Sequence, residues 1–191
     1  MGKIKTNKEF EQVAILIEEA RIRAFHKVNQ ELVLLYFRIG GIVSDKVAAG
    51  IWGDNTVDEL ASYIESKYPG LKGFNRRGLY RMKQFFETYS DPEFVSTLAT
   101  QLQQYFDTNK KQGKVSTLPT QNVKTKKVTA VGTQLNNTAS LTEKFVSSVL
   151  TQICWTNHRL ILSKTKSAEE QFYYLLTVIK ERYSSRELER A

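Results

Sequence analysis

The feature that most constrains the fold is an apolar repeat in the first quarter of the chain, from Lys8 to about Ala48. Its apolar residues recur at intervals of three and four, the spacing that places side chains on one face of an α-helix. The sequence therefore predicts one long helix, or two nearly continuous ones, with Asn7 or Thr6 as the N-cap. The residues that form this apolar seam are Phe10, Val13, Ile17, Ala20, Ala24, Val28, Leu32, Leu35, Ile39 and Ile42.

The seam has two interpretations. The stretch from Leu32 to Phe37 is apolar on more than one face, which predicts that the middle of the helix is buried on several sides. Gly40 and Gly41 weaken the helix and indicate a bend or a close helix crossing. The seam either packs in the core against later helices or forms the interface of a dimer or larger assembly. Few charged pairs flank it, which favours the core interpretation, and a homodimer stays open as the alternative.

Composition agrees with an all-α fold that begins with this long helix. The chain is 41% hydrophobic and 25% charged, as globular proteins are, and it has only three prolines among 191 residues. No apolar run near the start is long enough to span a membrane, and no secretory signal is present. The single cysteine, Cys154, excludes an internal disulfide and is expected to be a buried structural thiol. We therefore expect a cytoplasmic protein.

A second pattern, from Thr56 to Tyr89, has the layout of a helix, a short turn and a basic helix. The first helix is expected over about 57–68, with Thr56 as its N-cap and Glu59 as the capping-box partner. A Pro-Gly pair ends it, and Asn75 caps the second helix. This layout predicts a helix-turn-helix element.

The two sides of the second helix differ in chemistry. Leu79, Met82 and Phe86 fall in one narrow apolar sector, which is expected to pack on the first helix. The other side offers guanidinium and amide groups, which can contact phosphates and base edges of DNA. The alternative is a solvated basic face on an ordinary helical hairpin, and spacing alone does not decide between them. The candidate DNA-contacting residues are Lys72, Asn75, Arg76, Arg77, Tyr80, Arg81, Lys83 and Gln84.

Positive charge is concentrated in two segments of the chain. The net charge is +8, yet residues 72–86 contain five basic residues and no acidic one, and residues 108–142 contain six lysines and no acidic residue. Such concentration is typical of proteins that bind a polyanion, most often nucleic acid. DNA is therefore the expected partner. A membrane is not, because no basic amphipathic helix with a strong apolar face is present.

These patterns divide the chain into three parts. Residues 1–106 are expected to form a helical region with the helix-turn-helix at 56–89. Residues 107–140, rich in Lys, Thr, Gln and Asn, are expected to be a loop or insert, in which four valines could support a small β wing beside the basic helix. Residues 141–191 are expected to return to helix.

Local signals mark three further helix starts. Pro92 is expected at the first position of a helix that runs to about Phe106. Ser167 and Ser184 each precede a glutamate by three residues, which predicts two capping boxes.

No catalytic or metal site is indicated. His26 and His158 have no second ligand at metal-binding spacing. Phosphate-binding loops and nucleophile-elbow motifs are missing as well. His158, close to Trp155, is expected to be a hydrogen-bonded core histidine. We therefore expect no cofactor, no metal, no catalytic residue and no enzymatic activity of this chain.

Several stretches occur in an order that resembles one family. They are LIEEAR (16–21), NQELVLLYFRIG (29–40), GFNRRGLYRMKQF (73–85), LTQICWTNHRLIL (150–162) and FYYLLTVIKERYSSRELER (172–190). Together they resemble the N-terminal domain of the YhcG-like proteins, a domain of unknown function. The resemblance implies a helical, helix-turn-helix-like DNA-binding region that precedes a PD-(D/E)XK nuclease domain, which would begin after the SSRELER helix. The lysine-rich insert departs from the commoner family pattern.

The patterns and the resemblance together predict a non-catalytic DNA-binding module of a nuclease, which contacts DNA through the basic second helix. The alternative is an assembly or dimerisation domain that acts through the long N-terminal helix.

Overall fold

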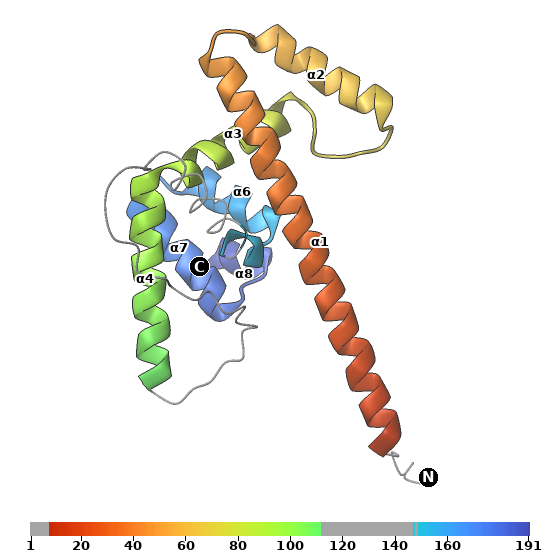
Figure 1. Cartoon of the computed structure of the whole chain (residues 1–191), viewed down its shortest axis with the longest axis vertical. Coiled ribbons are helices and arrows are strands. Elements are labelled where there is room, and N and C mark those ends of the chain that lie inside the picture. Colours follow the sequence, from red (N-terminus) through yellow and green to blue (C-terminus); the bar gives the residue numbers. More distant parts are fainter. Residues whose placement is uncertain (1–7, 112–146, 148) are drawn as a thin grey trace, which may run out of the picture.

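The computed structural model describes residues 8–111, 147 and 149–191, and every regular element in these ranges is helical. The predicted all-α fold is therefore confirmed. The wing and most of the helix expected over 141–153 lie outside the described residues. The elements are α1 (Lys8–Ala48), α2 (Asp54–Lys67), α3 (Arg76–Ser90), α4 (Pro92–Lys111), the short 3-10 helix η1 (Leu150–Gln152), α6 (Trp155–Lys164), α7 (Ala168–Glu181) and α8 (Ser185–Arg190) (Figure 1).

The long first helix has two unlike halves. Its fully buried residues all lie between Val33 and Ser44, where it packs against α3 and η1. The half that precedes Asn29 projects away from the rest of the molecule (Figure 1), and its side chains are exposed. The prediction of one long helix from Lys8 to Ala48 is confirmed.

The helices α1 and α3 cross in close contact at the two glycines of α1. A Cβ atom on Gly40 would overlap the backbone carbonyl oxygen of Met82, and one on Gly41 would lie 3.1 Å from Cε2 of Phe86. The helix is continuous through both glycines. Of the two predicted outcomes, the close crossing is therefore the one observed.

Two apolar clusters meet along α3. The larger one joins α1, α3, α4, η1, α6, α7 and α8 around Phe85, Tyr89 and Leu98. The smaller one fills the angle between α1, α2 and the start of α3, and it contains Val57, Leu79 and Met82. In the predicted apolar sector of α3, Leu79 and Met82 are buried in the smaller cluster, whereas Phe86 is half-buried and packs on Phe37 of α1. The sector therefore packs on α1 as well as on α2.

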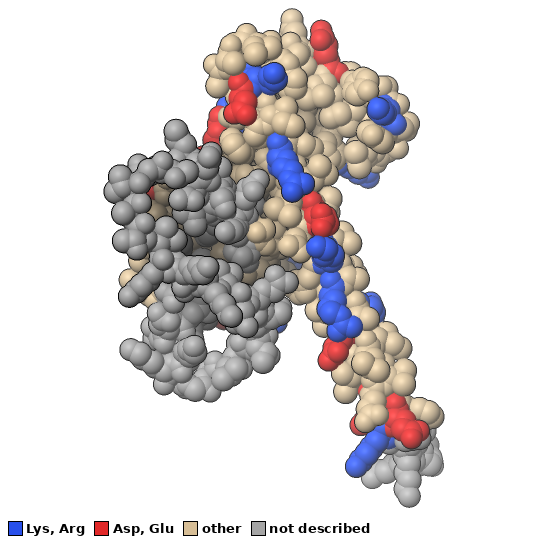
Figure 2. All heavy atoms as spheres, viewed as in Figure 1, with Lys and Arg blue, Asp and Glu red and all other residues tan. Residues whose placement is uncertain are grey.

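The apolar seam of α1 is not in either core. Phe10 is 68% exposed, Leu35 is 43% exposed and Ile42 is 55% exposed. The buried residues, such as Phe37 and Ser44, lie on roughly the opposite side of the helix. The core interpretation of the seam was therefore wrong for all its residues but Ile39, which is half-buried against the smaller cluster: α1 enters the core by another face, and the rest of the seam faces outward. Figure 2 shows acidic and basic side chains interspersed with uncharged ones along the visible side of α1.

Side-chain caps or a proline mark the starts of α3, α4, α7 and α8, whereas α2, η1 and α6 begin without a side-chain cap. Asn75 accepts a hydrogen bond from the backbone N–H of Gly78, Pro92 begins α4, and Ser184 forms a full capping box with Glu187, as predicted. Ser167 caps α7, but its predicted capping box is incomplete, because the Glu170 side chain accepts from the N–H of Lys166 instead. The Thr56 cap was wrong.

Helix α2 begins earlier than predicted, at Asp54. Its N-cap is Gly53, whose carbonyl accepts hydrogen bonds from the N–H groups of Thr56 and Val57. Because α2 begins early, Val57 already lies within the helix, where its side chain is fully buried in the smaller cluster. Tertiary burial therefore overrides the local Thr56 capping signal.

Two further expectations need correction. Cys154 is exposed at the N-cap position of α6, not buried as expected. Helix α4 continues to Lys111, so the first residues of the predicted insert are helical.

Candidate nucleic-acid interface

The predicted interface is carried by α3 and by the connection before it. The connection between α2 and α3 spans residues 68–75, which is longer than the 3–4-residue turn of a standard helix-turn-helix. Gly73 has a φ of 96°, a left-handed conformation that glycine adopts without strain. Lys72 is exposed in this connection. The Asn75 side chain is used as a cap, with its Oδ1 accepting from the backbone N–H of Gly78 at 2.8 Å.

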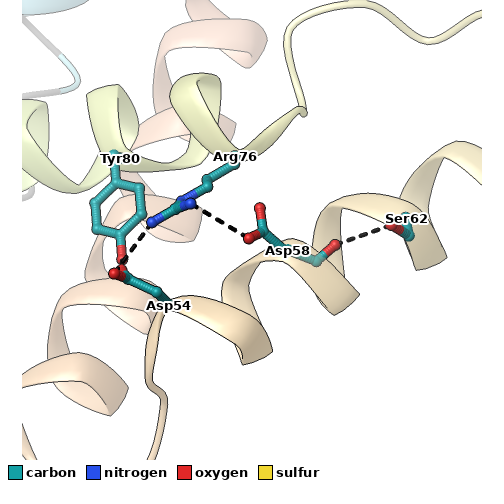
Figure 3. A network of polar contacts seen from close by, with 5 residues as sticks. All are labelled: Asp54, Asp58, Ser62, Arg76 and Tyr80. Atoms are coloured by element: carbon teal, nitrogen blue, oxygen red, sulfur yellow. Dashed lines mark hydrogen bonds and ion pairs between the residues drawn. The ribbon is translucent and has the colours of Figure 1, made fainter.

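Two of the predicted contact residues bind α2 instead of facing solvent freely (Figure 3). Arg76 lies 3.1 Å from Asp54 and 3.4 Å from Asp58, and the Tyr80 hydroxyl donates to Asp54 over 2.5 Å. The Arg76 guanidinium also lies over the Tyr80 ring, 5.8 Å from its centroid. We call these four residues the α2–α3 bracket.

The electrostatics of the bracket follow from its geometry. The hydrogen bond from Tyr80, and then the charge of Arg76, lower the pKa of Asp54. The same hydrogen bond raises the pKa of Tyr80. The carboxylates of Asp58 and Asp54 raise the pKa of Arg76, so its charge is neutralised locally by two acids.

Lys83 and Gln84 also have partners within the protein. Lys83 forms an ion pair with Glu87 at 2.7 Å, and Ser44 of α1 donates to the same carboxylate at 2.8 Å. Burial raises the pKa of Glu87, but the hydrogen bonds from Lys83 and Ser44 outweigh it, and the net shift is downward. The Gln84 amide lies 3.5 Å from the carbonyl oxygen of Leu162.

The remaining two arginines of α3 meet a third from α6. Partial burial lowers the pKa of Arg81, and the positive charges of Arg159 and Arg77 lower it further. Among the residues that the structure describes, none of these three arginines forms an ion pair with a carboxylate. We call Arg77, Arg81 and Arg159 the arginine cluster.

An open cleft of about 230 Å³ lies at this cluster. Arg81 and Arg159 line it together with Leu160, with the hydroxyl-bearing residues Thr156, Ser163 and Ser185, and with one acidic residue, Glu189. Guanidinium and hydroxyl groups are the donors that phosphate oxygens accept from. Repulsion among like charges would be relieved by a bound anion, so the cleft has the chemistry of a phosphate site.

Arg159 was not among the predicted contact residues, because it lies 78 residues beyond Arg81 in the chain and only the fold brings the two together. Its only signal was one basic residue in a stretch otherwise poor in charge.

His158, next to Arg159, is a core residue as predicted. It is fully buried, its Nε2 lies 2.9 Å from the carbonyl oxygen of Leu150, and burial lowers its pKa to about 4. Its ring packs edge-on against Phe85 and Tyr89. A neutral, enclosed imidazole of this kind supports the fold.

The described ranges contain neither a metal-binding cluster nor a membrane-spanning helix. No group of three or more His, Cys, Asp or Glu side chains is placed to hold a metal ion there. Within the same residues, no helix combines the length and the apolar character needed to cross a bilayer.

Comparison with known proteins gives one match. The model of the DUF1016 N-terminal domain matches residues 12–108, which is half of the chain and includes α2, α3 and most of α1 and α4. No curated protein and no solved structure matches the chain. This domain is that of the YhcG-like family and has no known function. The chain belongs to the DUF1016 N-terminal domain family.

Proposed function

We propose that this chain is a non-catalytic DNA-binding module, part of a larger nuclease, and that it grips the DNA backbone with the arginine cluster. The observation that carries the proposal is that Arg81 and Arg159 line one open cleft, that the charge of Arg77 acts on Arg81, and that none of the three arginines has a carboxylate ion-pair partner among the described residues. Placing like charges together costs free energy unless an anion binds between them. A phosphate diester supplies that anion.

The contacts divide into two kinds. Arg81 and Arg159, with the hydroxyls of the cleft, would hold phosphates from both strands or from successive nucleotides. Arg77, one turn before Arg81 on α3, and the exposed Lys72 would contact neighbouring phosphates. Lys and Arg contacts of this kind fix the protein on the duplex without reading its sequence.

The bracket residues have a different part in this proposal. Arg76 and Tyr80 hold α2 against α3, so they set the position of the α3 N-terminus. Lys83 and Gln84 likewise have protein partners. The proposed DNA contacts are therefore fewer than the basic composition of α3 suggests.

The first test is fluorescence anisotropy of the whole chain with a random duplex over a series of salt concentrations. If Lys72 and the three clustered arginines each neutralise one phosphate, the logarithm of affinity should fall with that of salt with a slope of about −4. A folded protein whose binding shows no salt dependence, or which does not bind at low salt, would contradict the proposal.

Two neighbours on α3 provide a matched comparison. Arg76→Gln and Arg77→Gln remove the same charge from adjacent positions, but only Arg77 lacks an acidic partner in the described structure. Arg77→Gln should lower the salt slope by about one, and Arg159→Gln should do the same. Arg76→Gln should leave the slope nearly unchanged. Equal effects of Arg76→Gln and Arg77→Gln would mean that the whole basic face, not the cluster, meets DNA.

A further inference from the structure

Among the described residues, the apolar seam of α1 is a second surface on which no other helix packs, apart from Ile39. It runs from Phe10 to Ile42, and apart from the half-buried Ile39 its residues are exposed. Over 32 residues the seam rises about 48 Å along a helix about 10 Å across. Isolated exposed apolar residues are common, but a continuous strip of this length marks an interaction surface.

The order of residues in the seam is symmetric. The intervals between successive seam residues are 3, 4, 3, 4, 4, 4, 3, 4 and 3, which read the same from either end. In an antiparallel pair of helices related by a two-fold axis, the numbers of two residues that face each other always add up to the same value, twice the residue number at the axis. With the axis at residue 26, every seam residue therefore lies opposite another seam residue.

We propose that the seam binds the seam of a second copy of this chain, with the two α1 helices antiparallel and the two-fold axis at residue 26. Phe10 then faces Ile42 of the second copy, Val13 faces Ile39, and Ile17 faces Leu35. Near the axis, Ala20 faces Leu32 and Ala24 faces Val28. Each small residue meets a larger one there, so the central helix axes can approach closely.

Charge along α1 fits the same orientation. Residues 9–19 contain four glutamates and no basic residue, and residues 33–43 contain one charge, Arg38. The antiparallel pair places these two stretches opposite each other. It also places Arg21 opposite Glu31 of the second copy, twice by symmetry. A parallel pair would instead set the four glutamates against themselves, and like charges that face each other are unfavourable.

The contact is large enough for a specific dimer. A strip about 48 Å long and about 10 Å wide offers on the order of 500 Å² per chain. The pair would then bury about 1,000 Å², the size that a specific interface requires. The buried face of α1 stays on its own chain, so dimerisation leaves both cores unchanged.

The first experiment measures the mass of the whole chain by light scattering and sedimentation over micromolar concentrations. We expect twice the 22.0 kDa of one chain. A monomer at tens of micromolar, folded by circular dichroism, would overturn the proposal, whether or not some other protein binds the seam.

Matched variants test the surface. Ile17→Glu lies on the seam and Ile15→Glu lies on the other side of α1, yet the two side chains are 56% and 57% exposed. Ile17→Glu introduces a charge at two symmetric places and should give a monomer, whereas Ile15→Glu should remain dimeric. If both variants stay dimeric, or if both become monomeric, the seam is not the interface.

Cross-linking tests the orientation. In a Cys154→Ser background, a chain with Ile17→Cys and a chain with Leu35→Cys should form a disulfide only when they are mixed, because these positions face each other. Disulfides within each single variant, and none in the mixture, would overturn the antiparallel arrangement in favour of a parallel one. DNA binding by Ile17→Glu reports separately on the arginine cluster.

Discussion

Helix α3 is held by two contacts of opposite character. Against α1 it is held by a dry crossing, in which Gly40 touches the backbone of Met82 and apolar side chains surround the contact. Against α2 it is also held by the bracket, in which exposed side chains of Arg76, Tyr80, Asp54 and Asp58 share ion pairs and a hydrogen bond (Figure 3). The comparison indicates that the crossing with α1 holds α3 in place, whereas the bracket mainly sets the position of α2 against α3.

A buried backbone contact has no freedom to relax, because the atoms on both sides belong to packed helices. An exposed ion pair is screened by water and salt, and its partners are long side chains that can move. We therefore expect changes at the crossing to unfold the domain. Changes in the bracket should shift α2 while α3 remains in place.

The largest effect is expected from Gly40→Ala. The new methyl group would overlap the carbonyl oxygen of Met82, so the two helices must separate. The free energy of unfolding should fall by about 3 kcal/mol, even though alanine is the better helix former. Urea denaturation followed by circular dichroism measures the loss.

The neighbouring glycine supplies the control for this change. In Gly41→Ala the methyl group would lie 3.1 Å from the edge of the Phe86 ring, which can turn aside. Its cost should be clearly smaller. If the two variants lose equal stability, the backbone contact at Gly40 does not set the crossing.

The next largest effect is a pH dependence of the free energy of unfolding, which comes from the buried side chain of His158. Burial lowers the pKa of His158 to about 4, below its ordinary 6.5, so the folded protein keeps this ring neutral while the unfolded chain takes up a proton. Stability is full above pH 6.5 and is lost as pH falls toward 4. Between pH 7 and pH 5 the loss should be about 2 kcal/mol.

His158→Gln separates this effect from other titrations. The variant should be less stable at pH 7, because it disturbs a buried hydrogen bond to Leu150, but its stability should change little between pH 7 and pH 5. A variant that keeps the wild-type slope would show that other groups cause the dependence.

A substitution of Tyr89 is expected to have a smaller effect in the opposite direction, a gain in stability. Its hydroxyl is buried and has no hydrogen-bond partner among the described residues, and burial raises the pKa of the phenol. Tyr89→Phe removes a buried polar group while it keeps the ring against Phe85 and Phe94. The melting temperature should rise, with a gain of about 1 kcal/mol in unfolding free energy. A loss of stability would indicate that the hydroxyl is hydrogen-bonded.

A contrast between local signals and contacts with distant residues explains which features the sequence could predict. Most signals that act within one turn predicted helix starts correctly, Thr56 excepted, since Asn75, Pro92, Ser167 and Ser184 each satisfy or remove backbone N–H groups near themselves. The length of α1 followed from its periodicity. The close crossing at the glycine pair was also among the expected outcomes.

Features that depend on a distant partner were missed. Periodicity shows that the seam is apolar, but it does not show which face of α1 packs against α3. In the structure the face with Gly40 and Gly41 packs there, because the two backbones can approach closely at the glycines. Arg76 and Arg77 look alike in sequence, and only the position of Asp54 and Asp58 on α2 separates them. The DNA contacts proposed for the arginine cluster remain a prediction for the binding experiments.

The smallest effect is expected from the bracket. Asp54→Asn removes the carboxylate that Tyr80 and Arg76 share, and Asp58 still faces Arg76. Because the bracket is exposed, the melting temperature should fall less than in Gly40→Ala, and added salt should reduce the difference from the wild type. Since the hydrogen bond from Tyr80 lowers the pKa of Asp54, the stability it contributes is present above the ordinary pKa of 3.8 and is lost as pH falls below it.

Hydrogen exchange locates the change made by Asp54→Asn. Protection should fall in α2 and in the connection over residues 68–75, while the amides of α3 near Met82 and Phe85 keep their protection because the crossing is intact. If α3 loses protection together with α2, the bracket and the crossing form one cooperative unit, and the position of the arginine cluster depends on both.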